Sequence, residues 1–392
     1  MRRKEIGNKV LLAVTGGVAA YKSLEILRLL VKKGINVKVV ITRGGERFVT
    51  PFSFLSLGAE EVYTDNDQFS IINGSSIHLA LSRWSDLIAV VPATADFIAK
   101  VASGISDSLL LTTLLASKKP VIVAPSMNEN MLLHPATQRN IEILKGFGYK
   151  IIEPDEGFLA DLAKGKGRLK DPEDIFEEIL VELTPKKLKG LKVLVTCGAT
   201  REYIDPVRFI TNGSSGKMGI AFAKVARRFG ADVTLIAAHT TEKLPMGMKI
   251  LRVDKTEELF EVVTDEVKKC DLLIMAAAPS DYRPEEMLHN KLPKLPELTI
   301  KLVSTVDVLK EASKYKDNKI FVGFALQTNN IIENAKKKLE EKNLDYVLGN
   351  SIENIGSDLG KVILMDRFGN ISEFEGDKES IAEFVLSKIF KF

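Results

Sequence analysis

Cysteine and histidine are scarce in this chain of 392 residues. The two cysteines and four histidines are Cys197, Cys270, His78, His134, His239 and His289. No CxxC pair and no HxxxH pair occurs among them, which argues against a disulfide framework and against a zinc site. So few cysteines fit a reducing compartment, and we expect a cytoplasmic protein.

Long apolar runs and a strong charge of one sign are also missing. No stretch approaches the ~20 apolar residues of a membrane-spanning helix, so no membrane partner is expected. The basic segment 1–4 precedes the apolar run Val10–Val14, which at five residues is too short for the core of a signal peptide. The net charge of +3 is too small to indicate a nucleic-acid partner, although it is compatible with anionic small molecules.

The remaining composition is that of a globular protein with ordinary cores. Hydrophobic residues make up 45% and charged residues 27%, and the length favours two or three domains. The first half opens with the apolar run Val10–Val14, the pair Gly16-Gly17, a helical pattern that Gly34 ends, and the apolar run Val37–Ile41. This order predicts a βαβ unit with parallel strands.

The second half repeats that plan. A strand is predicted at Val193–Thr196, a loop leads to Gly213–Gly216, a helical pattern includes Met218, and Asp232–Ala237 is the returning strand. Strand and helix patterns continue to alternate in both halves. This predicts an α/β fold of two doubly wound, Rossmann-like parallel sheets, the first of them flavodoxin-like.

A polar segment with proline and glycine, Thr184–Gly190, joins the two halves. Such a composition is typical of a linker. We therefore expect one domain at residues 1–188 and a second at residues 189–392.

A glycine-bearing loop lies between the first predicted strand and a helix, where backbone N–H groups can approach a phosphate. The loop, Thr15–Lys22, lacks GxGxxG spacing, which disfavours a dinucleotide as the ligand. The alternative to a phosphate-binding loop is an ordinary tight turn. The segments that accompany it are Thr42, Ser76–Ala80, Pro92–Asp96, Gly104–Asp107 and Pro125–Met131. In this order they resemble the flavin-containing cysteine decarboxylases, the family of phosphopantothenoylcysteine decarboxylase.

That resemblance implies an FMN-dependent decarboxylation in the N-terminal half. FMN would be held by Gly16, Gly17, Thr42, Pro92, Ala93 and Thr94. His78 would be the catalytic base, Asn128 would contact the substrate amide, and Asp96 would face the substrate carboxylate. For a histidine taken alone, a hydrogen-bonded position at a helix start is the alternative.

Two residues depart from the decarboxylase pattern. Asp96 replaces an asparagine, and a charged aspartate would repel the substrate carboxylate. Asp161 replaces a flap cysteine, which donates a proton when the reduced flavin returns its hydride. Because an ordinary aspartate is ionised at neutral pH, three alternatives stay open. In the first, Asp161 has a raised pKa and is the proton donor. In the second, another residue is the proton donor. In the third, the domain binds flavin without full turnover.

The segment Thr196–Gly219 resembles the signature of phosphopantothenate–cysteine ligase, and the resemblance continues to near the C-terminus. In such ligases a carboxylate attacks the α-phosphate of a nucleotide, and the cysteine amine then displaces the nucleotide monophosphate. Ser214–Gly216, before a helix, is a natural anion cradle. For an isolated Ser-Ser-Gly segment, an ordinary helix cap is the alternative.

The resemblance also assigns roles to residues of this half. Asn212 would hold the acyl intermediate, Lys291 would be needed to form it, and Arg208 would bind substrate. Lys338 and Lys342 are four residues apart, so one helical face presents both, and a solvated basic face is the alternative. The predicted nucleotide-binding residues are Ser214, Ser215, Gly216, Ala276, Ala277, Asp281, Lys291, Asp307, Phe324, Lys338 and Lys342.

Small departures occur in the ligase half as well. Pro293 replaces the second lysine of a Lys-Ile-Lys motif, Thr305–Val308 keeps only the aspartate of Asn-Pro-Asp-Ile, and Gln327-Thr328 replaces Glu-Thr. By resemblance, the fused layout favours CTP over ATP as co-substrate, together with Mg²⁺. No metal ligand is assigned.

The leading hypothesis is a bifunctional, homo-oligomeric enzyme of coenzyme A synthesis that acts on small molecules. It would join cysteine to 4′-phosphopantothenate with CTP and then decarboxylate phosphopantothenoylcysteine to 4′-phosphopantetheine with FMN. One alternative is an active ligase fused to a flavin-binding domain with impaired or absent decarboxylase turnover. A regulatory flavoprotein and a flavin NAD(P)H oxidoreductase are disfavoured, because the sequence has no acidic tail and no second dinucleotide loop.

Overall fold

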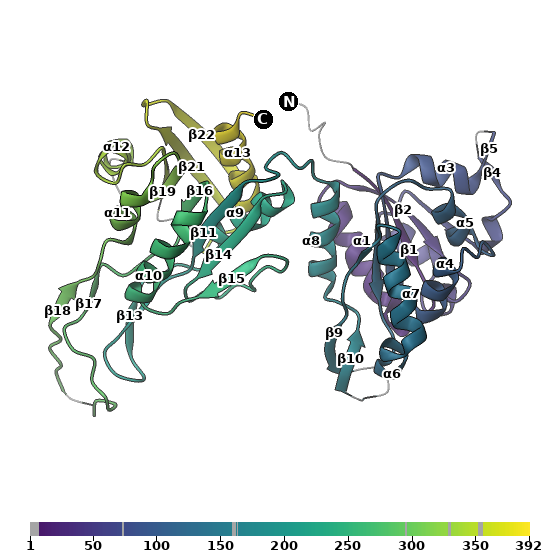
Figure 1. Cartoon of the computed structure of the whole chain (residues 1–392), viewed down its shortest axis with the longest axis horizontal. Helices are drawn as coiled ribbons and strands as arrows, with labels where there is room; N and C mark the ends of the chain where they lie inside the picture. Colours follow the sequence, from purple (N-terminus) through teal and green to yellow (C-terminus); the bar gives the residue numbers. More distant parts are fainter. Residues whose placement is uncertain are drawn as a thin grey trace. The chain divides into compact units, whose positions relative to one another are not determined.

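The computed structural model describes residues 8–72, 74–158, 162, 164–294, 296–327, 331–351 and 356–392. The chain forms two compact units that divide between Pro185 and Lys186, and each has a main sheet with helices on both faces (Figure 1). The predicted α/β class with two parallel-sheet domains is confirmed. Among the helices of the described residues, none is long and apolar enough to cross a membrane.

The N-terminal sheet has six parallel strands in the order β3-β2-β1-β6-β7-β8. They are β1 (Lys9–Val14), β2 (Asn36–Ile41), β3 (Glu61–Thr64), β6 (Leu87–Ala93), β7 (Val121–Pro125) and β8 (Lys150–Ile151). β6 and β7 are buried along their whole length, as expected of central strands that helices cover on both faces. The strand order reverses between β1 and β6, so the loops after these strands form a topological switch point.

Helices cover both faces of this sheet. They are α1 (Lys22–Lys32), α2 (Pro51–Ser56), α3 (Ile77–Trp84), α4 (Ala95–Ala102), α5 (Leu109–Leu115), α6 (Glu129–Leu133), α7 (Pro135–Gly146) and α8 (Pro172–Leu183). α1, α2 and α8 contribute to the core on one face, and α3, α4, α5 and α7 to the core on the other. The two hairpins are β4 (Ile71–Ile72) with β5 (Ser75–Ser76), and β9 (Asp155–Phe158) with β10 (Lys164–Arg168).

The C-terminal sheet has eight strands in the order β15-β14-β11-β16-β19-β20-β21-β22. They are β11 (Lys192–Cys197), β14 (Asp232–Ala237), β15 (Lys249–Arg252), β16 (Leu272–Met275), β19 (Ile320–Gln327), β20 (Tyr346–Ser351), β21 (Leu359–Asp366) and β22 (Ile371–Asp377). The first six are parallel, and β21 and β22 extend the sheet in antiparallel fashion. The strand order reverses between β11 and β16, which creates a second switch point.

Five helices cover the C-terminal sheet among its described residues. α9 (Lys217–Arg228) and α13 (Lys378–Phe390) pack on one face, and α10 (Thr256–Glu266), α11 (Val308–Ala312) and α12 (Ile331–Glu341) on the other. Two hairpins lie outside the sheet, β12 (Arg201–Tyr203) with β13 (Phe209–Thr211), and β17 (Tyr282–Pro284) with β18 (Leu302–Ser304). β12 and β17 lie side by side, and both hairpins project from the same end of the unit (Figure 1).

Candidate active sites

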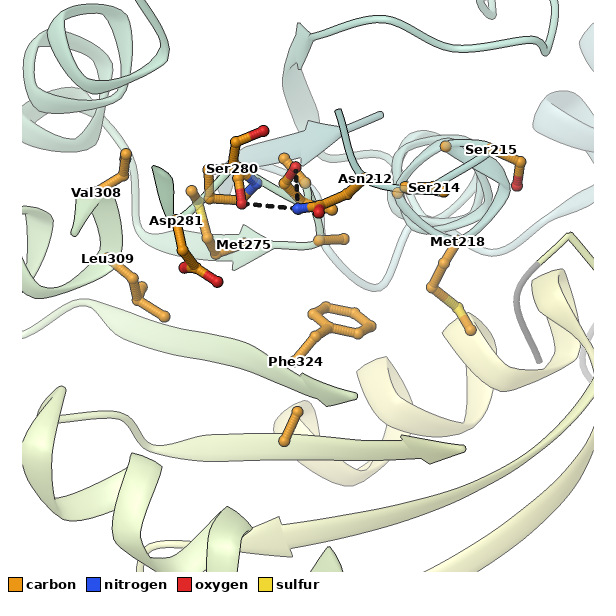
Figure 2. A pocket seen from close by; sticks show the side chains of 18 of the residues that line it. Asn212, Ser214, Ser215, Met218, Met275, Ser280, Asp281, Val308, Leu309 and Phe324 are labelled. Atoms are coloured by element: carbon orange, nitrogen blue, oxygen red, sulfur yellow. Dashed lines mark hydrogen bonds between the residues drawn. The ribbon is translucent and has the colours of Figure 1, made fainter. Parts of the chain in front are cut away.

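The C-terminal unit has a cavity at its switch point, where β11 and β16 end. Its volume is about 550 Å³, and its walls come from the loop before α9, the loop after β16, the start of α11, β19 and α12. Doubly wound folds bind their ligands at this place. Figure 2 shows Asn212 and Asp281 on one side of the space and Phe324 on the other.

The segment predicted as an anion cradle forms the N-terminus of α9. Gly216 caps the helix with a φ of 84°, and a Cβ there would lie 2.6 Å from Thr240 Oγ1. The same hydroxyl donates to the Ser215 carbonyl at 2.6 Å, which fixes the loop backbone. Position 216 therefore requires glycine, and the first turn of α9 lines the cavity with N–H donors suited to an anion.

Asn212 joins this loop to the loop that follows β16. Its amide nitrogen donates to the carbonyl of Ala278 at 3.3 Å and to that of Pro279 at 2.9 Å (Figure 2). The side chain is exposed and lines the cavity. Its carboxamide is thus held at the mouth of the cavity, between the anion loop and the end of the central strand.

Four lysines line the cavity: Lys217, Lys338, Lys342 and Lys378. Burial, together with the charge of Lys342, lowers the pKa of Lys338 to about 8, and its ammonium donates to the Phe324 carbonyl. Lys342 forms an ion pair with Asp307 at 2.9 Å. Burial alone would raise the pKa of Asp307, but hydrogen bonds from Lys342 and from the Lys310 N–H hold it below its ordinary value. Such a concentration of cations suits a polyanionic ligand.

Sequence reasoning missed two of these lysines. Lys217 directly follows Gly216 within the ligase-like segment, and its charge was the signal that could have identified it. In the structure it forms an ion pair with Asp358. Lys378, at the start of α13, is buried, and burial and Lys217 lower its pKa. It belongs to no recognised motif, and only the packing of α13 on the sheet places it at the cavity.

Most of the other predicted residues of this half line the same cavity, namely Asn212, Ser214, Ser215, Ala276, Ala277, Asp281, Asp307 and Phe324. Lys291 and Arg208 are not among the described residues that line it. Lys291 is exposed in the loop between β17 and β18. The Arg208 guanidinium pairs with Asp205 at 2.8 Å and donates to the Leu292 carbonyl. The roles predicted for Lys291 and Arg208 stay predictions.

A second cavity, of about 760 Å³, lies at the switch point of the N-terminal unit. It is lined by the loops after β1, β6 and β7 and by the β9–β10 hairpin. Met127, Met131 and Phe158 give it an apolar wall, with Asn128 and Arg168 as polar groups. A cavity of this size, mostly apolar with a few polar groups, fits a flavin.

The glycine loop of this cavity is held by Thr15, the first residue of the predicted loop, through side-chain hydrogen bonds that the sequence did not indicate. The Thr15 hydroxyl donates to the Pro92 carbonyl at 2.8 Å and accepts from the Thr94 N–H at 3.1 Å. This joins the ends of β1 and β6 directly beneath the loop. A Cβ at Gly16 would lie 2.8 Å from the Gly44 backbone, so glycine is required there.

Of the residues predicted to hold FMN, Gly16, Gly17 and Thr94 line the cavity, as does Asn128. Thr42, Pro92 and Ala93 do not line it. The Thr42 N–H donates to the Val14 carbonyl at 3.0 Å, and the Thr42 hydroxyl accepts from the Gly45 N–H at 3.3 Å. Thr42 therefore fixes the loop that packs on Gly16. Pro92 and Ala93 are buried in β6.

His78 and Asp96 are not among the described residues that line the N-terminal cavity. His78 is the second residue of α3 and is half-buried. The exposed Asp96 lies in the first turn of α4 and pairs with Lys100 at 3.5 Å. Asp161 lies outside the described residues.

The hairpin on either side of position 161 is anchored to the cavity wall. The Glu129 carboxylate accepts from the Lys166 N–H at 2.8 Å, and the Met127 N–H donates to the Gly167 carbonyl at 3.0 Å. Gly167 has a φ of 130°, and a Cβ there would lie 2.0 Å from the Met127 oxygen. Among the described residues, no group of three or more His, Cys, Asp or Glu side chains forms that could hold a metal ion.

Comparison with known proteins identifies both units. The family described as "Flavoprotein" matches residues 1–184, and the family described as "DNA/pantothenate metabolism flavoprotein C-terminal domain" matches residues 188–392. The coenzyme A biosynthesis bifunctional protein CoaBC of Bacillus subtilis (strain 168) is 44% identical over 357 residues, 90% of this chain and 87% of that protein. The chain belongs to the family of coenzyme A biosynthesis bifunctional proteins CoaBC.

Another CoaBC protein, from Borreliella burgdorferi, is 36% identical over 97% of this chain and 98% of its own length. The crystal structure of the C-terminal domain of a CoaBC protein matches at 35% identity with a TM-score of 0.47, over 53% of this chain and 97% of that one. The family membership confirms the kind of enzyme that the sequence predicts, a ligase joined to a flavoprotein decarboxylase.

Proposed function

We propose that the C-terminal unit binds CTP in its cavity and uses it to join cysteine to 4′-phosphopantothenate. The observation that carries this proposal is the anion loop Ser214–Gly216 together with four lysines in one cavity at the switch point. The carboxylate of 4′-phosphopantothenate attacks the α-phosphorus of CTP, and pyrophosphate leaves. The cysteine amine then attacks the acyl carbon, CMP leaves, and an amide forms.

The charges of the cavity fit each stage of this reaction. The N–H groups of the first turn of α9, with Lys338 and Lys342, neutralise phosphate oxygens, whose charge grows as pyrophosphate leaves. Asn212 holds the acyl intermediate at the mouth of the cavity. Phe324 packs edge-on against Phe222, with ring centroids 5.7 Å apart, so its ring is held in place beside the base.

Asp281, a carboxylate that lines the cavity, fits a magnesium ion that arrives with CTP, whereas both oxygens of Asp307 already accept from Lys342 or the Lys310 N–H. Mg²⁺ in nucleotide sites is held by one or two carboxylates together with phosphate oxygens and water.

For the N-terminal unit we propose FMN as the cofactor and decarboxylation of phosphopantothenoylcysteine to 4′-phosphopantetheine as the reaction. When bound, FMN would take two electrons from the substrate thiol, which lets carbon dioxide leave, and would return them to the decarboxylated enethiol, so that the overall reaction is redox-neutral. Gly16 and Gly17 provide the close backbone approach to the cofactor. Asn128, fixed at the start of α6 by accepting the Asn130 N–H at 2.9 Å, orients the substrate amide. His78 takes the proton from the substrate.

The enzyme acts in the cytoplasm as a homo-oligomer. His78, Arg208 and Lys291 do not line the cavities of their own chain, and a second copy is one way to supply them. Phe69 and Ile71, close before His78 in the chain, are 91% and 74% exposed. Neighbouring apolar side chains with this exposure are typical of a surface that another protein covers.

The test is pyrophosphate release by the purified protein with 4′-phosphopantothenate, cysteine, Mg²⁺ and either CTP or ATP. The proposal expects release with CTP at a higher kcat/KM than with ATP. Release with ATP alone contradicts the choice of nucleotide, and no release with either contradicts the ligase assignment.

A further inference from the structure

The two carboxylate oxygens of Asp205 bind different segments of the chain. Oδ1 accepts the N–H groups of Val207 and Arg208, both at 2.9 Å, which closes the turn between β12 and β13. Oδ2 accepts the Leu292 N–H at 3.1 Å, from the loop between β17 and β18. Asp205 therefore ties together two hairpins that are far apart in the sequence.

The Leu292 peptide is held from both ends. Its N–H donates to Asp205 Oδ2, and its carbonyl accepts from the Arg208 guanidinium, which itself lies 2.8 Å from Asp205 Oδ2. A further contact fixes the same loop upstream, where the Leu288 N–H donates to the Ile204 carbonyl at 3.0 Å. The loop thus has two anchor points on the β12–β13 turn, at Leu288 and at Leu292.

Lys291 lies between these anchors, directly before Leu292. Its neighbours Asn290, Pro293 and Lys294 are exposed, as is Lys291 itself, so no core packing fixes this part of the loop. The position of the Lys291 backbone consequently depends on the bonds at Leu288 and Leu292. Of these, only the two bonds at Leu292 are made to charged groups, Asp205 and Arg208.

Asp205 is fully buried and carries its charge through the whole range of assay pH. Burial by itself would raise its pKa, but the N–H groups of Val207, Leu292 and Arg208, with the Arg208 charge, lower it to about 2. A buried carboxylate that accepts from three backbone N–H groups and a guanidinium is a rigid anchor, because moving any one of these donors weakens the stabilisation of a buried charge.

We propose that Asp205 is a positioning residue, which acts through the Leu292 peptide to fix the loop that carries Lys291, and that this fixed position is what lets the Lys291 cation take part in formation of the acyl-nucleotide. The inference rests on the proposed function of the C-terminal unit and on the role proposed there for Lys291. It predicts that loss of the Asp205–Leu292 bond impairs the chemical step and leaves nucleotide binding intact.

The variant that separates the two oxygens is Asp205→Asn. With its amide oxygen at the Oδ1 position, asparagine keeps the β12–β13 turn, whereas an NH₂ group at the Oδ2 position can accept neither from the Leu292 N–H nor from the Arg208 guanidinium. We expect kcat for pyrophosphate release to fall by between about tenfold and a hundredfold, as a small misplacement of a reacting group does. KM for CTP should stay within about twofold, because the contacts that bind CTP equally in the ground state and the transition state are kept.

The matched control is Asp366→Asn. Asp366 closes the turn between β21 and β22 in the same way, with Oδ1 accepting the N–H groups of Phe368 and Asn370 at 2.9 Å, and it is not among the described residues of the cavity. This variant should keep the wild-type kcat. Equal losses in the two variants would show a general effect of removing a turn carboxylate and would overturn the proposal.

A double-mutant cycle distinguishes positioning from a merely structural role. If Asp205 acts through Lys291, then Asp205→Asn should add almost nothing to the loss of kcat in Lys291→Ala. If the double variant instead shows the product of the two separate losses of kcat, the residues act independently and the proposal is overturned. Should Asp205→Asn fail to fold, Leu292→Pro removes the same N–H and leaves the carboxylate in place, and full kcat in that variant would also overturn it.

Different results would contradict the ligase function and the positioning role of Asp205. If the wild-type protein releases no pyrophosphate, the proposed function is wrong. If the wild type is active and Asp205→Asn equals it in kcat, the ligase stands and the positioning role of Asp205 is wrong.

Discussion

Lys342 Nζ lies 2.9 Å from Asp307 Oδ2 in the wall of the C-terminal cavity, four residues after the half-buried Lys338. The two lysines share one helical face but differ in their surroundings. Lys342 has a carboxylate partner, whereas burial and the charge of Lys342 lower the pKa of Lys338 to about 8. The protonation of Lys338 therefore changes just above neutral pH.

The affinity for CTP should fall as the pH rises through about 8. Below that pH Lys338 is already protonated and can bind phosphate. Above it, the neutral Lys338 amine must take up a proton when CTP binds, which weakens the affinity. Loss of one charge-assisted bond corresponds to a roughly tenfold weaker Kd. Calorimetric titration one unit below and one unit above this pKa measures the effect.

Two variants serve as controls for this titration. Lys338→Met should bind weakly at both pH values, whereas Lys337→Met should keep the wild-type pH dependence. Lys337 lies on the same helix, is exposed and pairs with Glu341 at 3.7 Å. A wild-type affinity that does not change between the two pH values contradicts the assignment of Lys338 to phosphate binding.

Lys291→Ala and Asn212→Ala should block the ligase at different stages. Without the Lys291 cation, formation of the acyl-nucleotide loses several kcal/mol of transition-state stabilisation, so pyrophosphate release should fall by roughly 10²-fold or more. Asn212→Ala should still release pyrophosphate but convert the intermediate slowly, since only a neutral contact is lost. Mass analysis of quenched reactions detects the intermediate. Equal pyrophosphate release by Lys291→Ala and the wild type would show that Lys291 has no part in the step.

The purified protein should be yellow with bound FMN, and Gly16→Ala should lose the cofactor. The added Cβ would lie 2.8 Å from the Gly44 backbone, so the loop that approaches the cofactor must move. Gly146→Ala is the control, because a Cβ at the end of α7 meets nothing within 4 Å. The flavin absorbance per protein measures occupancy. A colourless wild type that takes up no added FMN contradicts the prediction, as does full occupancy in Gly16→Ala.

Much of the fold could be predicted from the sequence, because both halves contain apolar runs joined by helical patterns. The switch-point loops were also predictable, since Gly16-Gly17 and Ser214–Gly216 each lie between a strand and a helix. The antiparallel pairing of β21 was not predictable, because a short apolar run carries no information about the direction of its neighbour.

In the candidate sites, only the residues that belong to a sequence motif or to a helical spacing pattern were predictable. Lys338 and Lys342 share a helical face by spacing, and both line the cavity. Lys378 comes from a helix far along the chain, and only tertiary packing brings it to the same cavity. The anchoring of the Lys291 loop by Asp205 likewise depends on two hairpins meeting in space, which no local pattern encodes.

The role of Asp161 is open to a direct test of product mass. An ordinary aspartate is already ionised at neutral pH, so it is a poorer proton donor than a thiol. Oxidation and decarboxylation of the substrate should therefore proceed, while reduction of the enethiol is slow. Asp161→Asn should abolish the remaining reduction, and Asp161→Cys should speed it. The oxidised enethiol is two hydrogens lighter than 4′-phosphopantetheine. If Asp161→Asn makes 4′-phosphopantetheine as fast as the wild type, the acid lies elsewhere.

The central claim is that one chain ligates cysteine to 4′-phosphopantothenate with CTP and then decarboxylates the product with FMN. The most direct measurement is mass analysis of all products formed by the purified wild-type protein from 4′-phosphopantothenate, cysteine, CTP and Mg²⁺. We expect CMP, pyrophosphate and phosphopantothenoylcysteine, followed by its decarboxylated products. Accumulation of phosphopantothenoylcysteine alone would leave a ligase joined to a flavoprotein without turnover, and absence of phosphopantothenoylcysteine and of every product derived from it would contradict the account as a whole.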